Sequence, residues 1–420
     1  MLRILTSKDA PRLLRRRAAR LDEAEETVRP ILADVRRRGD AALLEYARRF
    51  DGFEGRSVLV GQARLEEAAR RLSPAFRRAL RMSRKNVAAF ARMQLPRPRR
   101  ITPAPGLRLG QIVRPLEAAA AYIPSGRYPL PSTVVMTVVP ARVAGVKTIM
   151  VCTPRPSEEI FGAAHLLGAT HVFQMGGAHA IAGFAYGTKT VPRADRIVGP
   201  GNIYVAAAKK LLAGEVGIDF LAGPSEILLI AAEGDPRSIA ADMLAQAEHD
   251  TDASAILLTP SRKLAEAVAA EAARQLETLP TAATAREALR RNSAILVVSS
   301  LEEAMELSNR FAPEHLSIPA AALLAQVRHA GSVFIGPWSP EAAGDYASGP
   351  NHVLPTSGAA RLRGGLSAAD FVKVISYQEL SPKALGRLAP AITTLARAEG
   401  LEAHARSVEV RFEKKGEGRC

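Results

Sequence analysis

The side chains best suited to proton transfer are Glu314 and His315, which stand next to each other directly after Pro313. A carboxylate and an imidazole can both titrate near neutral pH when they are partly buried, as general acid–base catalysis requires. Adjacent Glu and His residues are also common on solvated surfaces, so the pair alone is weak evidence. Half of the eight histidines lie in polar settings of this kind, and together they could furnish a metal site.

Four polar residues from three distant segments are candidate metal ligands: Gln246, His249, Asp345 and His404. The first two end the apolar stripe of a helix that we expect to start at Asp235, the N-cap before Pro236. Asp345 falls in the glycine-rich segment 344–352, predicted to be a loop, and His404 should point inward from a C-terminal helix. Nitrogen and oxygen donors without a thiolate suit zinc or another divalent ion. For Gln246 and His249, a structural hydrogen-bond network is the simpler alternative.

Two glycine turns follow predicted strands and precede predicted helices, at Gly176-Gly177 and at Gly199 to Gly201. Glycines at the start of a helix offer an anion site made of free backbone N–H groups. The Gly-x-Gly-x-x-Gly fingerprint is absent from every strand–helix junction. Either turn could be merely tight, but two in one domain favour a bound dinucleotide.

The elements that must position these residues alternate along the chain. Residues 1 to about 100 are charged and helical in pattern, as in 22–49. Strands are predicted at 148–152, 171–174, 196–198, 226–231, 255–258, 294–298 and 332–335, with helices such as 262–276 and 301–310 between them, and helix returns over 382–410. This alternation predicts an α/β architecture with largely parallel sheets. Gly/Pro-rich turns at 125–132 and 222–225 mark the edges of an inserted domain.

The composition excludes several classes of protein. The chain has 420 residues, enough for two or more packed units, and 47% of them are hydrophobic. A formal charge of +15 comes mostly from arginines dispersed along helices, and aromatic residues make up only 5%, which disfavours nucleic-acid binding. The basic field would still attract anionic ligands such as a dinucleotide. Two cysteines, no signal peptide and no membrane-spanning apolar run predict a soluble, cytoplasmic protein.

Longer strings carry a resemblance to a known family. They are YIPSGRYPLPSTVVM (122–136), GPGN (199–202), AGPSEILLI (222–230), QAEHD (246–250), APEHL (312–316), GDYASGPNHVLPT (344–356) and EGLEAH (399–404). From about Val28 to Arg411 the chain resembles the histidinol dehydrogenases. The resemblance implies oxidation of L-histidinol through bound L-histidinal to L-histidine with two NAD molecules.

The resemblance also implies roles for individual residues. One zinc ion would be held by Gln246, His249, Asp345 and His404, and would position the imidazole and amine of the substrate. The substrate pocket would comprise these four ligands together with Ser225, His315, His352 and Glu399. His315 would be the base for alcohol oxidation, and Glu314 would activate water for aldehyde oxidation. The NAD contacts would be Tyr122, His179 and Asn202, although the family usually has Gln where this chain has His179.

The resemblance further implies two incomplete Rossmann-like domains with parallel-sheet cores, plus small helical segments at both ends. We expect an N-terminal segment over 1–23 and a discontinuous domain over 24–121 and 225–366, which carries the metal and the catalytic residues. An inserted NAD-binding domain over 122–224 and a C-terminal segment over 367–420 complete the chain. The C-terminal segment would mediate a homodimer, so that His404 and Glu399 serve the site of the partner subunit.

Two other functions compete with this one. A related enzyme could keep the metal, the base and NAD but oxidise another small primary alcohol, such as a hydroxylated sulfonate. A basic nucleic-acid-binding or scaffold protein would instead show salt-sensitive duplex binding. The dispersed arginines and the scarcity of aromatic residues argue against the second alternative.

Overall fold

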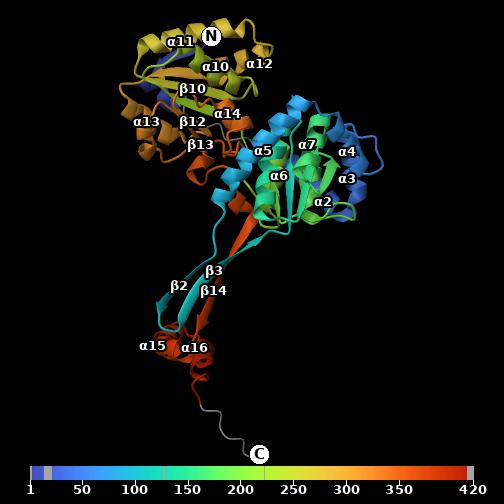
Figure 1. The fold of residues 1–420 in the computed structure, drawn as a ribbon, viewed down its shortest axis with the longest axis vertical. Coiled ribbons are helices and arrows are strands. Elements are labelled where there is room, and N and C mark those ends of the chain that lie inside the picture. Colours follow the sequence, from blue (N-terminus) through green and yellow to red (C-terminus); the bar gives the residue numbers. More distant parts are fainter. Residues whose placement is uncertain (1, 14–20, 126–127, 222, 414–420) are drawn as a thin grey trace, which may run out of the picture. The chain divides into compact units, whose positions relative to one another are not determined.

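The computed structural model describes residues 2–13, 21–125, 128–221 and 223–413. Parts of the predicted terminal segments (14–20 and 414–420) and of both predicted boundary turns (126–127 and 222) lie outside the described residues. The chain divides into two compact units, Met1–Gln94 with Leu116–Phe371 and Leu95–Pro115 with Val372–Cys420. Figure 1 shows the elements of each unit.

The first unit contains a five-stranded parallel sheet with helices on both faces (Figure 1). Its strand order is β6 (His171–Gln174), β5 (Thr148–Thr153), β4 (Ala118–Tyr122), β7 (Arg196–Val198) and β8 (Gly217–Ile218). One face packs against α2 (Leu21–Arg38), α3 (Asp40–Asp51), α8 (Gly177–Tyr186) and α9 (Ile203–Leu212). The other packs against α4 (Gln62–Arg71), α5 (Pro74–Gln94), α6 (Pro131–Ala144) and α7 (Glu158–Leu167).

A six-stranded sheet, also parallel throughout, forms the rest of the first unit. Its strand order is β1 (Arg3–Thr6), β11 (Ala294–Val297), β10 (Ser254–Thr259), β9 (Glu226–Ile230), β12 (His315–Ile318) and β13 (Ser332–Ile335). One face packs against α10 (Pro236–Ala247), α11 (Arg262–Leu276) and α12 (Ala282–Asn292), and the other against α13 (Leu301–Phe311). A short helix near the N-terminus, α1 (Ala10–Leu13), also belongs to this unit, as does α14 (Glu341–Tyr346).

The second unit is smaller and antiparallel. Its sheet has the order β14 (Val372–Leu380), β3 (Leu107–Pro115) and β2 (Arg99–Ala104), followed along the chain by α15 (Pro382–Ala398) and α16 (Glu402–Glu409). Strands β2, β3 and β14 were not predicted from the sequence, because their residues show no continuous apolar run.

The predicted α/β class with parallel sheets is confirmed, and all seven predicted strands are present within a residue or two of their expected ends. The Asp235 cap is also confirmed, because its carboxylate accepts a hydrogen bond from the N–H of Arg237 at 3.0 Å. The segment 22–49, predicted to be helical, spans two helices, because Gly39 has a φ of 55° and interrupts the run.

The N-terminal segment, predicted to be helical, contributes β1 to the six-stranded sheet. The edges of the predicted domains stay predictions. Among the described helices, none combines the length and the apolar character needed to cross a membrane.

Candidate active site

Glu314 and His315 lie in the interior of the first unit, at the start of β12. Helix α13 ends at Phe311, and the left-handed φ of 53° at its C-cap Ala312 turns the chain through Pro313 toward the sheet. His315 then pairs with Ile227 of β9 and Ser332 of β13. Glu314 and His315 are only 5% and 4% exposed, so this is not a pair on a solvated surface.

The hydrogen bonds of His315 define which ring nitrogen can act as a base. Its Nδ1 lies 3.2 Å from the backbone carbonyl oxygen of Glu226. A carbonyl can only accept a hydrogen bond, so Nδ1 carries the proton in the neutral ring. Nε2 is buried, has no hydrogen-bond partner among the described residues, and lies 3.8 Å from Oδ1 of Asp345. In the neutral ring, Nδ1 is therefore held by this hydrogen bond and Nε2 carries the lone pair.

Three carboxylates surround this imidazole. Nδ1 lies 3.2 Å from Glu341 and 3.7 Å from Glu314. Burial opposes a charge on His315, but the negative charges of Glu341 and Glu314 outweigh it and raise the pKa of the imidazole to about 10. Burial raises the pKa of Glu314 to about 8 and that of Glu341 to about 8. Both carboxyl groups therefore keep a proton more readily than an exposed glutamate, and a bound cation would favour their charged forms.

The same acidic groups form a cluster that fits a metal ion. Ligand atoms of His249, Glu341 and Asp345 all lie within 4.8 Å of one another. Glu341 is 3% exposed, and neither of its carboxylate oxygens has a hydrogen-bond partner among the described residues. Sequence reasoning missed Glu341, although it stands four residues before Asp345, a spacing that places both on one side of a helix.

Gln246 lies on α10, nearly one turn before His249. The residue is 0% exposed, and its side-chain oxygen and nitrogen both lack a hydrogen-bond partner among the described residues. A buried amide with neither group satisfied is costly. No hydrogen-bond network among the described residues satisfies the Gln246 amide.

Asp345 does not lie in a loop as predicted. It belongs to the short helix α14, which begins after Pro340. Gly344 is required there for packing, because a Cβ at this position would lie 2.7 Å from the ring of Phe334. Residues 344–346 of the predicted loop are therefore helical, whereas 347–352 form neither helix nor strand.

His352 lies close to Asp345 and was also predicted. Its Nδ1 donates to the backbone oxygen of Asp345 at 2.8 Å, so Nε2 is free to accept a hydrogen bond from the Thr133 hydroxyl at 3.3 Å. Burial lowers the pKa of His352, which keeps the ring neutral. Ser225, another predicted pocket residue, directly precedes β9 and is half-buried, and its backbone oxygen accepts from Ser254.

Glu399 and His404 belong to the second unit. Glu399 is the C-cap of α15 and is exposed. The prediction that His404 points inward is wrong for the single chain, because its side chain is exposed. Ala405 and Val408 form the buried stripe of α16 instead, which leaves His404 beside that stripe.

The three predicted NAD contacts lie around the five-stranded sheet. Tyr122 ends β4 and is 3% exposed, and His179 lies in the first turn of α8 and is 1% exposed. Asn202 is exposed and caps α9, its side-chain oxygen accepting from the N–H groups of Tyr204 and Val205 at 3.1 Å.

The prediction of free N–H groups in the two glycine turns is wrong at three positions. The N–H of Gly176 donates to Asp51 at 2.9 Å, and that of Gly177 donates to the Tyr122 hydroxyl at 3.2 Å. The N–H of Gly199 donates to Asp219 at 2.7 Å. Side chains distant in sequence therefore occupy donors that would otherwise bind an anion.

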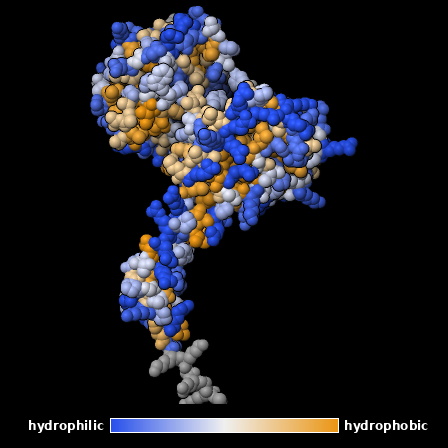
Figure 2. All heavy atoms as spheres, in the orientation of Figure 1, coloured by the Kyte–Doolittle hydropathy of each residue, from blue (hydrophilic) through white to orange (hydrophobic). Residues whose placement is uncertain are grey.

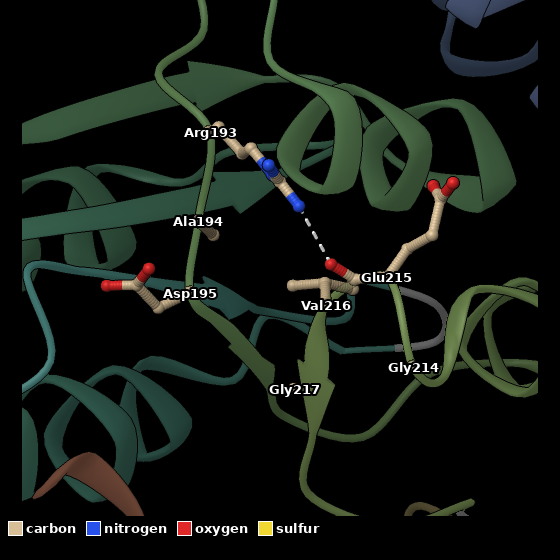
Figure 3. Close-up of a pocket in the computed structure, with 7 residues that line it drawn as sticks. All are labelled: Arg193, Ala194, Asp195, Gly214, Glu215, Val216 and Gly217. Atoms are coloured by element: carbon tan, nitrogen blue, oxygen red, sulfur yellow. Dashed lines mark hydrogen bonds between the residues drawn. The ribbon is translucent and has the colours of Figure 1, made fainter. Parts of the chain in front are cut away.

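A separate pocket of about 500 Å³ lies among Arg193, Ala194, Asp195 and residues 214–217 (Figure 3). Its polar groups already have partners. Arg193 donates to the backbone oxygen of Glu215 at 2.9 Å, and Asp195 accepts from two backbone N–H groups, of Glu117 and Ala118. None of the predicted site residues lines this pocket, so it is not the candidate active site.

Two parallel sheets and a buried imidazole beside a cluster of nitrogen and oxygen ligands define an α/β enzyme that performs acid–base chemistry. The model of the histidinol dehydrogenase family matches residues 14–412. The chain belongs to the histidinol dehydrogenase family.

Relatives and a solved structure agree with this assignment. The chain is 48% identical over 408 residues to the histidinol dehydrogenase of Geobacter metallireducens, and the match covers 94% of each chain. It is 49% identical over 401 residues to that of Geobacter sulfurreducens, with 93% of this chain and 94% of the relative covered. The crystal structure of histidinol dehydrogenase from Elizabethkingia anophelis superimposes with a TM-score of 0.94 at 35% identity, covering 98% of both chains.

Proposed function

We propose that this chain oxidises L-histidinol through bound L-histidinal to L-histidine, and that each oxidation transfers a hydride to one NAD. The main support for the proposal is the environment of the Nε2 atom of His315. It is buried, has no hydrogen-bond partner among the described residues, and lies 3.8 Å from Asp345 of the acidic cluster. An unpaired buried base beside candidate metal ligands is typical of a site that a substrate completes.

The residues fit a zinc ion held by Gln246, His249 and Asp345 of one chain and His404 of a second chain. The unsatisfied amide of buried Gln246 supports this set, as does the proximity of His249 and Asp345. Bound there, zinc would orient the imidazole and amine of the substrate and offset the carboxylates that otherwise hold a proton on His315. Glu341 lies in the same cluster and, through its contact with His315, is suited to orient the base.

In the alcohol step, Nε2 of His315 would accept the hydroxyl proton, and bound NAD would supply the acceptor for the hydride that leaves the carbinol carbon. The products are the aldehyde, NADH and a protonated imidazole. The Glu226 carbonyl keeps Nδ1 in place throughout, so the ring does not have to reorient. Glu341 and Glu314 stabilise the imidazolium that forms.

In the aldehyde step, Glu314 takes a proton from water as the water oxygen adds to the aldehyde carbon. Once His315 has released its first proton to solvent, the resulting hydrate anion would lose a hydride to a second NAD and a proton to His315, which leaves the carboxylate product. Glu314 is oriented for this role because its Oε2 accepts from the N–H of Glu226 at 2.8 Å. Burial raises its pKa to about 8 and makes it a stronger base than an exposed glutamate.

The other predicted residues complete the proposal. Ser225, His352 and Glu399 would line the substrate pocket, with neutral His352 available as a hydrogen-bonding group. Tyr122 and Asn202 would contact NAD at one edge of the five-stranded sheet. His179, predicted as a third contact at that edge, is buried and its Nε2 lies 3.0 Å from Asp51, so it would act there through that carboxylate.

A homodimer would explain the surface of the second unit. Large apolar side chains are exposed there, among them Val374, Ile375, Leu395, Leu401 and Phe412. Figure 2 shows apolar residues interspersed with hydrophilic ones on this unit. Exposed apolar groups in such number favour an interface with another chain. Glu399 and His404 are exposed in the same unit, which leaves them free to reach a partner's site.

The reaction is tested by following NAD reduction with purified enzyme. We expect two NADH per L-histidine formed, loss of turnover on chelation, and its recovery with zinc. No turnover of L-histidinol, with turnover of another small alcohol such as a hydroxylated sulfonate, would establish the alternative specificity.

The shared site is tested by mixing two inactive variants, His315→Asn and His404→Asn, after reversible dissociation. If the site takes His404 from the other chain, a mixed dimer has one intact site. Random pairing should then restore about a quarter of the wild-type activity. A site completed within one chain would give no restoration.

A further inference from the structure

His179 does not face the solvent from which a dinucleotide would arrive. Its Nε2 lies 3.0 Å from Oδ2 of Asp51, the last residue of α3, and the two side chains are 1% and 7% exposed. A carboxylate accepts hydrogen bonds, so Nε2 carries a proton. The imidazole also packs against the rings of Tyr46 and Phe50, with centroids 6.0 and 6.3 Å away. Helix α3 therefore holds the imidazole ring both by a hydrogen bond and by aromatic packing.

The same Asp51 oxygen holds the glycine turn that follows β6. It accepts from the N–H of Gly176 at 2.9 Å, and the next N–H, of Gly177, donates to the Tyr122 hydroxyl at 3.2 Å. Two successive backbone groups of the turn are thus fixed by side chains from α3 and β4. Gly177 has a left-handed φ of 55°, which suits glycine, and the turn opens directly into α8.

We propose that Asp51 and His179 are positioning residues for NAD: their hydrogen bond sets the Gly176-Gly177 turn in the shape that binds the dinucleotide. His179 acts through Asp51 and does not touch the cofactor. This inference rests on the proposed function, in which NAD binds at this edge of the five-stranded sheet.

The second glycine turn is built in the same way. Asp219 accepts from the N–H of Gly199 at 2.7 Å and from the buried ammonium of Lys209 at 2.7 Å. Gly199 has a φ of 104°, and a Cβ there would lie 2.2 Å from the backbone oxygen of Tyr122. Both turns thus contact Tyr122, and each is held by a buried carboxylate that is itself paired with a basic side chain.

The chain offers a matched control on the same helix. Asp40, at the start of α3, accepts from the hydroxyl of Thr190 at 2.7 Å. Asp40→Ala also removes a hydrogen bond between α3 and the five-stranded-sheet region, but far along the helix from the glycine turn. A general loss of stability should affect Asp40→Ala and Asp51→Ala alike, whereas loss of positioning should affect only the latter.

The test compares His179→Ala, His179→Gln, Asp51→Ala, Asp51→Asn, the His179→Ala/Asp51→Ala double variant and the Asp40→Ala control. The dissociation constant of NAD is measured by calorimetry on zinc-loaded enzyme, and amide exchange of a peptide spanning 174–182 is measured without NAD. Loss of a hydrogen bond to a charged group corresponds to about a tenfold to hundredfold weakening. We expect this weakening, with faster exchange, in both alanine variants, while kcat at saturating NAD changes much less.

The conservative variants and the double variant separate positioning from direct contact. His179→Gln and Asp51→Asn should recover at least tenfold of the lost affinity, because each preserves the hydrogen bond. The double variant should bind no worse than the weaker single variant.

Wild-type NAD affinity in Asp51→Ala, additive losses in the double variant, or unchanged amide exchange would each overturn the inference. If the wild-type enzyme itself failed to bind NAD, the proposed function would fail, while amide exchange would still decide whether the pair holds the turn.

Discussion

Replacing His315 with asparagine probes the proposed base while preserving its anchor. In the His315→Asn variant, the introduced side-chain amide can donate to the Glu226 carbonyl, as Nδ1 now does at 3.2 Å. The shorter side chain provides no nitrogen lone pair at the position of Nε2. The buried carbonyl therefore keeps its partner, and the change removes the proton acceptor alone.

The expected loss follows from the role of the ring. A positioned general base contributes about a hundredfold to ten-thousandfold to rate. This corresponds to about 3–5 kcal/mol of activation free energy at 1.36 kcal/mol per tenfold. We expect a fall in kcat for histidinol in this range, with zinc content unchanged, because His315 is not one of the four proposed ligands Gln246, His249, Asp345 and His404.

The assay follows NADH formation at saturating histidinol and NAD, with zinc measured by elemental analysis on the same sample. His165→Asn is the matched control, because this histidine lies on α7 and contacts Gln62 at 3.2 Å, away from the site. A kcat within tenfold of wild type in His315→Asn, with zinc retained, would refute the role of the base. Zinc loss in proportion to activity would show that His315 is a ligand.

Three further predictions address the acid–base pair, the metal and a buried carboxylate. Glu314→Gln should slow oxidation of supplied L-histidinal at least tenfold more than oxidation of L-histidinol. The introduced amide can still accept a hydrogen bond from the N–H of Glu226 but cannot deprotonate water. Equal losses of rate in both assays would contradict the separate roles of Glu314 and His315. His249→Asn should lower the zinc retained after dialysis by tenfold or more, measured by elemental analysis, and wild-type retention would remove His249 from the ligand set. Burial raises the pKa of Asp242 to about 6 from a reference of 3.8. As the pH rises from 4 to 6, the unfolded chain loses this proton more readily than the folded chain, so the folded state becomes less stable. Asp242→Asn should therefore raise the free energy of unfolding by about 1–2 kcal/mol at pH 7.5, after allowance for solvent screening, and this gain should vanish near pH 4. Denaturant titrations at both pH values measure the gain. A gain that is independent of pH would show that it does not come from ionisation of Asp242.

Local signals predicted the parts of the site that depend on short stretches of chain. Asp235 and Pro236 predicted the start of α10, and the positions of Gln246 and His249 in the sequence placed both residues near its C-terminal end. Glu314 and His315 are neighbours in sequence, so any fold that buries one brings the other close. The apolar runs of β9, β10 and β11 were recognisable because strands buried on both faces need continuous hydrophobic residues.

Long-range pairings could not be predicted in this way. Asp51 accepts a hydrogen bond from the N–H of Gly176, which is 125 residues away, and no local sequence pattern links the two positions. Strand β4 was missed because Ala118 to Ala121 carry little strand propensity, and its place in the centre of the sheet overrides that preference. Glu341 was missed because Gly344 suggested a loop, whereas Glu341–Tyr346 is a helix in which the absent Cβ of Gly344 leaves room for the Phe334 ring.

The metal site gives the most direct test of the account. A crystal of the zinc-loaded enzyme soaked with L-histidinol, with anomalous data collected at the zinc edge, would locate the ion and its ligands. The account predicts one peak per chain, about 2.0–2.2 Å from Gln246, His249 and Asp345 and from His404 of a second chain, with the substrate hydroxyl facing Nε2 of His315. A peak bound by His249, Glu341 and Asp345 of one chain alone, or one remote from His315, would contradict it.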